Sequence, residues 1–124
     1  MAKKILLVED NAVNMRLVKL TLKNDDYEFI EAVNGEEALE QAAQERPDII
    51  ILDIQIPKLD GYEVTKRLKA DAALSKIPII ALTAHAMKGD EERILGVGCN
   101  TYVSKPLDTH AFRDLVKKYL YEGV

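Results

Sequence analysis

The sequence predicts an α/β protein in which a parallel sheet is covered by helices on both faces. Strand-like and helix-like segments alternate five times along 124 residues. The strongest strand candidates are apolar throughout instead of alternating, at 5–8, 49–52 and 79–82. Strands of this kind are buried on both faces, as in parallel sheets. The length suits a single domain spanning residues 1–124, with one hydrophobic core.

The individual elements follow from spacing and from residues that start or stop a helix. We expect strands at 5–8, 27–33, 49–52, 79–82 and 101–103. Apolar residues at Val13, Leu17, Leu20 and their neighbours have helical spacing and predict a helix over 11–24. Asn34 followed by Glu37 predicts an N-cap for a second helix, which Pro47 ends. Further helices are expected over 62–70 and 90–95, and after Asp108, where Phe112, Leu115, Val116, Tyr119 and Leu120 form a core-facing stripe.

Composition excludes several classes of protein. Seventeen Lys and Arg against twenty-one Asp and Glu give a net charge of −4, so we expect no direct binding of nucleic acid. No apolar run approaches the ~20 residues that span a bilayer, so we expect no membrane insertion. One cysteine, Cys99, excludes an internal disulfide framework and fits a reducing compartment. We therefore expect a cytoplasmic protein.

Polar residues directly follow four of the five strands. Glu9 and Asp10 follow the first, Asp53 the third and Thr83 the fourth, and the fifth ends in Ser104-Lys105-Pro106. The carboxyl ends of parallel strands meet at one edge of the sheet, where ligands bind. Clustered carboxylates repel one another, and a hard divalent cation such as Mg2+ relieves this. An Asp beside Mg2+ can act as a nucleophile toward a phosphoryl group, with Lys105 and Thr83 placed to bind its oxygens.

Taken singly, each of these residues has a plainer explanation. Glu9 and Asp10 could cap a helix, Asp53 could end a strand, and Thr83 is an ordinary strand residue. Their joint placement at matching strand ends is what favours a site. A zinc site formed by His85, His110 and Cys99 is not supported, because their spacing matches no usual zinc pattern. Asp25-Asp26 follows a helix and is expected to be a solvated turn.

Four motifs then resemble the landmarks of bacterial receiver domains, the response regulators of two-component signalling. They are VEDN at 8–11, LDIQIP at 52–57 with Asp60-Gly61, LTA at 82–84 and YVSKP at 102–106. The resemblance covers essentially the whole chain. Residues 83–92 (TAHAMKGDEE) are most similar to single-domain regulators of the DivK cell-division type. The resemblance implies a doubly wound, flavodoxin-like (βα)5 sandwich with the five parallel strands in the order 2-1-3-4-5.

The resemblance also implies a role for each site residue. Asp53 would be the phosphoacceptor, receiving its phosphoryl group from a histidine on a kinase or a phosphotransfer protein. Asp10, Asp53 and the backbone carbonyl of Gln55 would ligate Mg2+ directly, and Glu9 would act through water. Lys105 would pair with the phosphoryl group, aimed by a cis Lys105-Pro106 bond.

Further implied roles concern switching and lifetime. Thr83 and Tyr102 would be the switch pair that reshapes the last helix–strand–helix face, and output would pass through contact with a downstream protein. Gln55 and His85 would tune the lifetime of the aspartyl phosphate. The domain would take part in its own phosphorylation and dephosphorylation but would have no separate substrate, and so would not be an enzyme.

Four other functions are alternatives to this one. A phosphatase of the haloacid-dehalogenase class needs a second acid where this chain has Gln55, whose amide is no general acid. A flavodoxin-like electron carrier needs a phosphate-binding loop where residues 9–13 are acidic. A degenerate receiver would normally lack Asp53, Thr83 or Lys105. A receiver excised from a hybrid histidine kinase would look the same as a free-standing one.

Overall fold

The computed structural model describes residues 2–56, 59–84, 88–105 and 107–121. Five strands form one sheet in the order β2-β1-β3-β4-β5, and every neighbouring pair is parallel. The strands are β1 (Lys3–Val8), β2 (Tyr27–Ala32), β3 (Ile49–Asp53), β4 (Ile79–Thr83) and β5 (Thr101–Ser104). The helices between and after them are α1 (Ala12–Leu22), α2 (Gly35–Glu45), α3 (Gly61–Ala70), α4 (Lys88–Gly96) and α5 (Thr109–Tyr121). The expected strand order and parallel sheet are confirmed.

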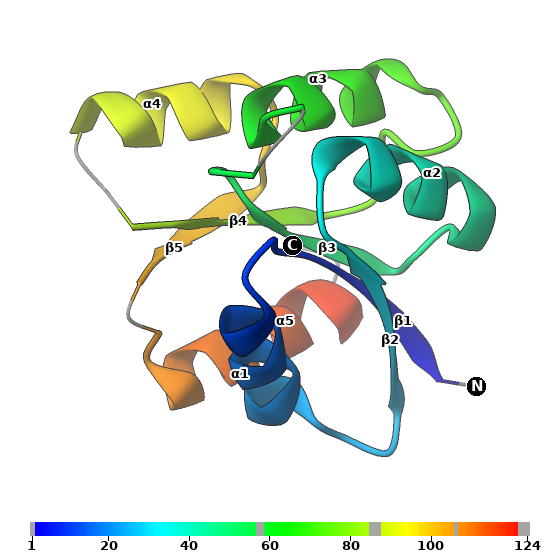
Figure 1. Cartoon of the computed structure of the whole chain (residues 1–124), viewed down its shortest axis with the longest axis vertical. Coiled ribbons are helices and arrows are strands. Elements are labelled where there is room, and N and C mark those ends of the chain that lie inside the picture. The colour runs from blue at the N-terminus through cyan, green and yellow to red at the C-terminus, as the bar shows by residue number, and fades with distance from the viewer. Residues whose placement is uncertain (1, 57–58, 85–87, 106, 122–124) are drawn as a thin grey trace.

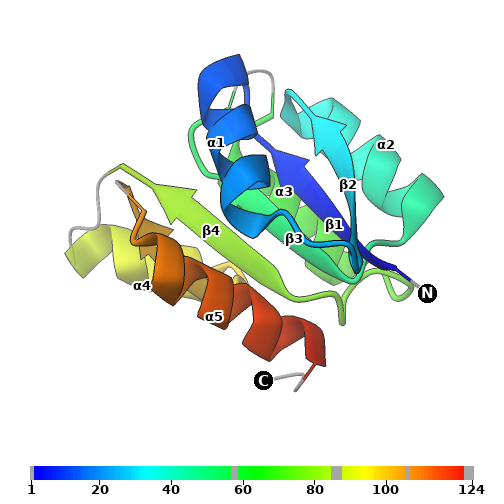
Figure 2. The same ribbon diagram turned by 90° about the horizontal axis from the view of Figure 1, so that it is seen from below.

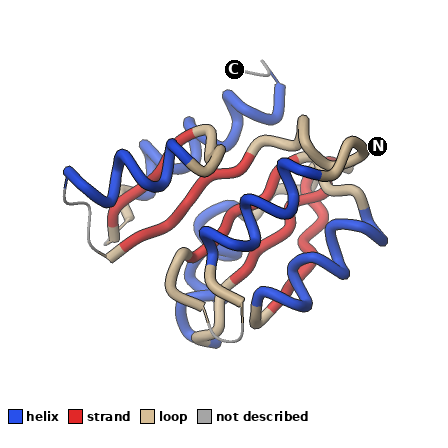
Figure 3. Tube along the Cα trace, turned by 90° about the horizontal axis from the view of Figure 1, so that it is seen from above, coloured by secondary structure: helices blue, strands red, loops and turns tan. Residues whose placement is uncertain are grey.

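Helices cover both faces of the sheet, which divides the core into two clusters. Figure 1 shows α2, α3 and α4 on one side of the sheet and α1 and α5 on the other, and Figures 2 and 3 show the two layers from opposite sides. Successive residues of β1 alternate between clusters: Leu6 and Val8 pack toward α2, α3 and α4, whereas Ile5 and Leu7 pack toward α1 and α5. This alternation explains why the strands are apolar at every position.

Side-chain caps start the helices where the sequence predicted them. The Asn34 Oδ1 accepts a 2.9 Å hydrogen bond from the backbone N–H of Glu37, as in a capping box, but the Glu37 carboxylate accepts from the backbone N–H of Val33, one residue before the N-cap. Asp108 caps α5 through a 3.0 Å bond from the backbone of Ala111. The stripe on α5 is confirmed, since Phe112, Val116 and Leu120 are buried against the sheet.

Helix α1 is present, but the apolar residues named for it do not anchor it. Val13, Leu17 and Leu20 are 67%, 55% and 60% exposed. Its buried residues are instead Met15, Val18 and Leu22. The helix carries apolar residues on two sides, so helical spacing alone does not reveal which side meets the sheet.

The ends of several other elements differ from the prediction. Helix α4 begins before and ends after the predicted 90–95, and Gly96 is its last residue. Gly98, two residues further on, has a φ of 115° in the left-handed region, which favours glycine. Within the described parts of the chain, no helix has the length and apolar character needed to cross a membrane.

Candidate phosphoacceptor and metal site

The sheet register brings the predicted site residues to one edge. Val8, the last residue of β1, lies opposite Leu52 of β3, so Glu9 follows its strand beside Asp53. Asp53 is paired with Leu82 on β4, and Thr83 with Ser104 on β5. The backbone N–H of Lys105 donates a 2.8 Å hydrogen bond to the Thr83 carbonyl, which extends the β4–β5 pairing by one residue. All four strand ends therefore open onto the same space.

Three carboxylates gather in this space. One ligand oxygen from each of Glu9, Asp10 and Asp53 lies within 4.8 Å of the others. Glu9 and Asp53 are buried, at 3% and 5% exposed, whereas Asp10 is exposed. Two acids of the cluster are therefore buried, and the third faces solvent.

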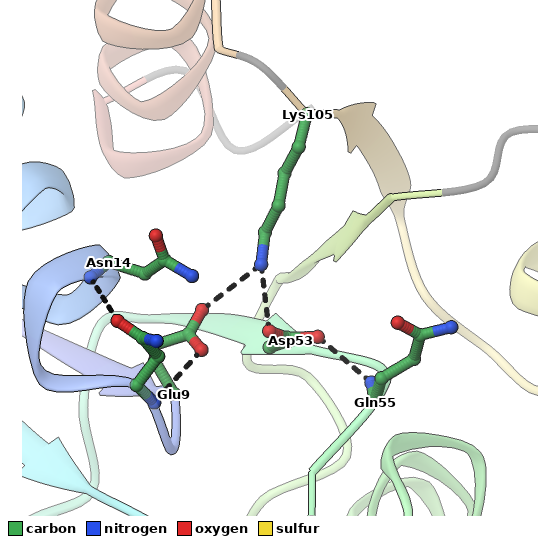
Figure 4. A network of polar contacts seen from close by, with 6 residues as sticks. Glu9, Asn14, Asp53, Gln55 and Lys105 are labelled. Carbon is green, nitrogen blue, oxygen red and sulfur yellow. Dashed lines mark hydrogen bonds and ion pairs between the residues drawn. The ribbon is translucent and has the colours of Figure 1, made fainter.

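Lys105 joins the two buried acids. Its Nζ lies 2.9 Å from Asp53 Oδ2 and 3.3 Å from Glu9 Oε2 (Figure 4). Backbone N–H groups hold the remaining oxygens: Gln55 donates to Asp53 Oδ1 at 2.9 Å, and Asn11 donates to Glu9 Oε1 at 3.2 Å. Each buried carboxylate is therefore fixed at both oxygens.

The loop after Asp53 is held down by a close approach at Gly61. The Gly61 N–H donates a 3.1 Å bond to the Ile54 carbonyl. A Cβ at Gly61 would lie 2.7 Å from the Cα of Ile54, so a larger residue would push the loop away. The Asp60-Gly61 motif therefore has two roles. Gly61 allows the close approach to Ile54, and Asp60 caps α3 by accepting a hydrogen bond from the Glu63 N–H.

The electrostatics of the site follow from burial and from crowding of like charges. Burial, together with the hydrogen bond and negative charge of Asp53, raises the pKa of Glu9 to about 7, against the opposing effects of the Asn11 N–H and Lys105. Burial lowers the pKa of Lys105, but its hydrogen bond to Asp53 and the two nearby carboxylates outweigh burial and raise it. Lys105 is therefore firmly charged, and Glu9 titrates near neutral pH.

The remaining predicted residues are placed unequally. Thr83 is buried at the end of β4, and Tyr102 is half-buried on β5 against the core cluster shared by α2, α3 and α4. The side chain of Gln55 is exposed beside the acceptor loop. His85 and Pro106, and with them the tuning role and the cis bond, lie outside the described residues.

Two further residues near the site were not predicted. Tyr62 of α3 and Arg93 of α4 line a cavity of about 500 Å3 together with Gln55 and Thr83. The Arg93 guanidinium carbon lies 3.8 Å from the centroid of the Tyr62 ring, a cation–π contact. No sequence motif joins these residues, which meet only because α3 and α4 are neighbours in the fold.

The donor set fits a hard divalent cation. Carboxylate oxygens are the ligands Mg2+ prefers, and two such oxygens on one Mg2+ are at most about 4.2 Å apart at its usual bond lengths of about 2.1 Å. A separation within 4.8 Å needs only a small shift of side chains. Among the described His, Cys, Asp and Glu side chains, this is the only such group. The zinc alternative includes His85, which lies outside the described residues.

The sheet has the strand order β2-β1-β3-β4-β5, and acids, a threonine and a lysine lie at the carboxyl ends of its strands. This combination defines the class of receiver-type α/β domains. The family model for the response regulator receiver domain matches residues 5–117 of this chain, so the chain belongs to that family. The chain is 50% identical over 120 residues to the polar-differentiation response regulator DivK of Brucella anthropi, covering 97% of this chain and 98% of that protein. The DivK of Brucella ovis is 48% identical over the same span.

Solved structures give the same result. A putative response regulator from Chloroflexus aurantiacus superposes with a TM-score of 0.91 at 31% identity, covering 97% of this chain and 98% of that one. The receiver domain of a sensor histidine kinase from Pseudomonas aeruginosa, described with a magnesium ion coordinated in its active-site cleft, has a TM-score of 0.88, 35% identity and the same coverage. The chain is therefore a DivK-like receiver domain of two-component signalling, and the phosphatase and electron-carrier alternatives are set aside.

Proposed function

We propose that Asp53 is the phosphoacceptor of this receiver and takes its phosphoryl group from a phosphohistidine of a kinase or phosphotransfer protein. The observation that carries the proposal is the Lys105 ammonium 2.9 Å from Asp53 Oδ2, inside a cluster of three acids. A carboxylate oxygen of Asp53 forms the new P–O bond while the P–N bond to the donor imidazole breaks. The electron pair of that bond returns to the ring nitrogen.

The other site residues position this transfer. Glu9, Asp10, Asp53 and the backbone carbonyl of Gln55 would hold Mg2+, with Asp10 and Asp53 in direct contact and Glu9 acting through water. When bound, the cation supplies positive charge to the phosphoryl oxygens. Lys105 stays charged and donates to a phosphoryl oxygen in exchange for its present bond to Asp53.

The response to phosphorylation passes through Thr83 and Tyr102. The Thr83 hydroxyl donates to the phosphoryl group, and Tyr102, half-buried on the neighbouring strand, turns inward and changes the surface of α4, β5 and α5. That surface then binds a downstream protein. The domain acts on no separate substrate, because both partial reactions occur at its own Asp53.

The donor docks on the flank of α1 that faces α5. A groove of about 500 Å3 runs there from Glu9 and Lys105 along Leu17 and Leu107. Leu17 is 55% exposed and Val13, one turn earlier, is 67% exposed, so an apolar surface lies beside the acceptor. A helix that carries the donor histidine can cover this surface while its imidazole reaches Asp53.

The single cysteine fits a reducing compartment, and we place the domain in the cytoplasm.

The test is phosphorylation of Asp53→Asn by acetyl phosphate with Mg2+, followed by intact mass. The amide keeps the shape and removes the nucleophile, so the variant should gain no phosphoryl group while its circular dichroism matches wild type. Asp114→Asn on exposed α5 removes the same charge and should be phosphorylated normally. Phosphorylation of Asp53→Asn at the wild-type level would refute the assignment.

A further inference from the structure

Helix α4 is held to the rest of the fold by few buried side chains. Among its described residues only Ile94 is buried, whereas each of the other four helices buries three or four residues. The neighbouring Leu95 is 48% exposed. An element with few buried apolar contacts is among the first to shift when its surroundings change. The remaining contacts of α4 therefore decide how easily it moves.

One cation–π contact joins α4 to α3, its neighbour on the same side of the sheet (Figure 1). The guanidinium carbon of Arg93 lies 3.8 Å from the centroid of the Tyr62 ring. Among the described side chains of α4, at residues 89–96, no other forms a hydrogen bond, ion pair or ring contact with another element. Asp60 and Asp90 line the same cavity as Arg93, but neither forms an ion pair with it. The Tyr62 ring, and not a carboxylate, therefore holds this guanidinium.

The stack lies beside the proposed switch residues. Tyr62 and Arg93 line a cavity of about 500 Å3 together with Thr83, and α4 begins five residues after Thr83. Movement of Thr83 toward a phosphoryl group therefore acts on the connection that leads into α4. Tyr62 and Tyr102 pack against the same core cluster. An inward turn of Tyr102 therefore repacks the cluster on which the stacked ring rests.

We propose that the Tyr62–Arg93 stack is a latch that holds α4 in its arrangement before phosphorylation and so opposes phosphorylation of Asp53. The latch rests on the function proposed above, in which the switch pair moves once Asp53 is phosphorylated. In the present arrangement Lys105 contacts the unmodified Asp53 carboxylate, so the stack belongs to the state before transfer. A contact made in only one of two states shifts their equilibrium by its own free energy. Both stacked residues act through α4 and are positioning residues.

The latch is modest in strength. Arg93 is exposed and Tyr62 is half-buried, and a cation–π contact at such a site changes an equilibrium about threefold, or about 0.7 kcal/mol. Loss of the stack should therefore favour the phosphorylated arrangement about threefold. A phosphoryl group that engages the switch pair can overcome a contact of this size, so the latch sets the ease of switching without blocking it.

Binding of beryllium fluoride with saturating Mg2+ tests the latch in the full chain. Beryllium fluoride mimics a phosphoryl group on Asp53, and its dissociation constant is read from amide chemical shifts. Tyr62→Leu and Arg93→Gln should each tighten binding about threefold. The double variant should bind no more tightly than either single variant, because both substitutions remove the same contact. Tyr62→Phe keeps the aromatic ring and should stay within about 1.5-fold of wild type.

Matched controls remove similar side chains elsewhere. Tyr121→Leu abolishes a second cation–π contact, in which Lys3 Nζ lies 5.5 Å from the Tyr121 ring centroid. Arg67→Gln removes an exposed arginine of α3. Neither should change the dissociation constant by more than about 1.5-fold. The melting temperature of each variant separates the latch from a purely structural role, since a stack that only supports the fold would lower it and leave beryllium fluoride binding unchanged.

Three results would overturn the latch. The first is wild-type affinity for beryllium fluoride in both Tyr62→Leu and Arg93→Gln. The second is weaker binding in these variants, which would assign the stack to the phosphorylated arrangement. The third is additive effects in the double variant, because the two residues would then act separately. Arg93→Gln changes an exposed side chain, so it carries the test if Tyr62→Leu does not fold. A wild-type chain that binds no beryllium fluoride would instead refute the phosphoacceptor function, and the latch with it.

Discussion

Glu9→Gln should stabilise the protein at alkaline pH and have little effect at acid pH. Glu9 is 3% exposed, and its pKa is raised from 4.5 to about 7. The folded state therefore binds its proton more tightly than the unfolded state does. The stability that this proton provides is complete below about pH 4.5 and is lost as the pH rises through 7. A neutral amide keeps that stability at every pH.

The size of the effect follows from the two pKa values. A shift from 4.5 to about 7 corresponds to a penalty of about 3 kcal/mol for the ionised group at pH 8 and about 1 kcal/mol at pH 5. Both are upper values, since the amide oxygen accepts a weaker bond from Lys105 than the carboxylate does. At about 4 °C per kcal/mol for a domain of this size, the melting temperature should rise by up to about 12 °C at pH 8.

The assay is thermal unfolding followed by circular dichroism at pH 5 and pH 8, with EDTA present because a divalent cation would favour ionised Glu9. Glu28→Gln, which removes an exposed charge on β2, serves as the control and should change stability by less than about 0.5 kcal/mol. An equal gain at both pH values would show that Glu9 titrates normally. A loss of stability at pH 8 would show that its bond to Lys105 outweighs burial and repulsion.

Further outcomes are expected at the same site. Millimolar Mg2+ should raise the melting temperature of the unphosphorylated wild type, and Asp10→Ala should abolish that rise, because a ligand of the folded state alone stabilises it; an unchanged wild-type curve would contradict the metal assignment. Lys105→Met should bind Mg2+ several-fold more tightly by calorimetry, since an ammonium 2.9 Å from Asp53 opposes a second cation, and weaker binding would refute this reasoning. Gln55→Ala and His85→Ala should change the decay rate of the phosphorylated protein; decay constants within twofold of wild type, about 0.4 kcal/mol in barrier, would remove the tuning role.

The fold could be predicted largely because its strands are unusually uniform. The apolar runs at 49–52 and 79–82 became β3 and β4, with every residue from Ile49 to Asp53 buried. The order of the strands required the family resemblance, since apolar runs do not say which strands are neighbours. The orientation of α1 was not predictable from spacing, because Met15, Val18 and Leu22 compete with an equally regular outer set.

The site could be predicted as a set of residues but not as an arrangement. Strand ends identified Glu9, Asp10, Asp53, Thr83 and Lys105, because parallel strands end at the same edge. Sequence alone could not tell that Glu9 turns inward to Lys105 while Asp10 faces solvent. Adjacent residues at a strand end point in different directions, and the Asn11 N–H, which fixes Glu9, belongs to the start of α1.

Formal charge explains why phosphorylation of this site should depend on a divalent cation. Three carboxylates and one ammonium leave a formal charge of about −2 when all are ionised. Esterifying Asp53 removes one carboxylate charge and adds a phosphoryl group of about −2, so the product without a cation would reach about −3. Mg2+ brings the unphosphorylated cluster to about zero and the product to about −1. Burial disfavours net charge, which is also why it raises the pKa of Glu9. The cluster is therefore less stable without a cation than with Mg2+ bound.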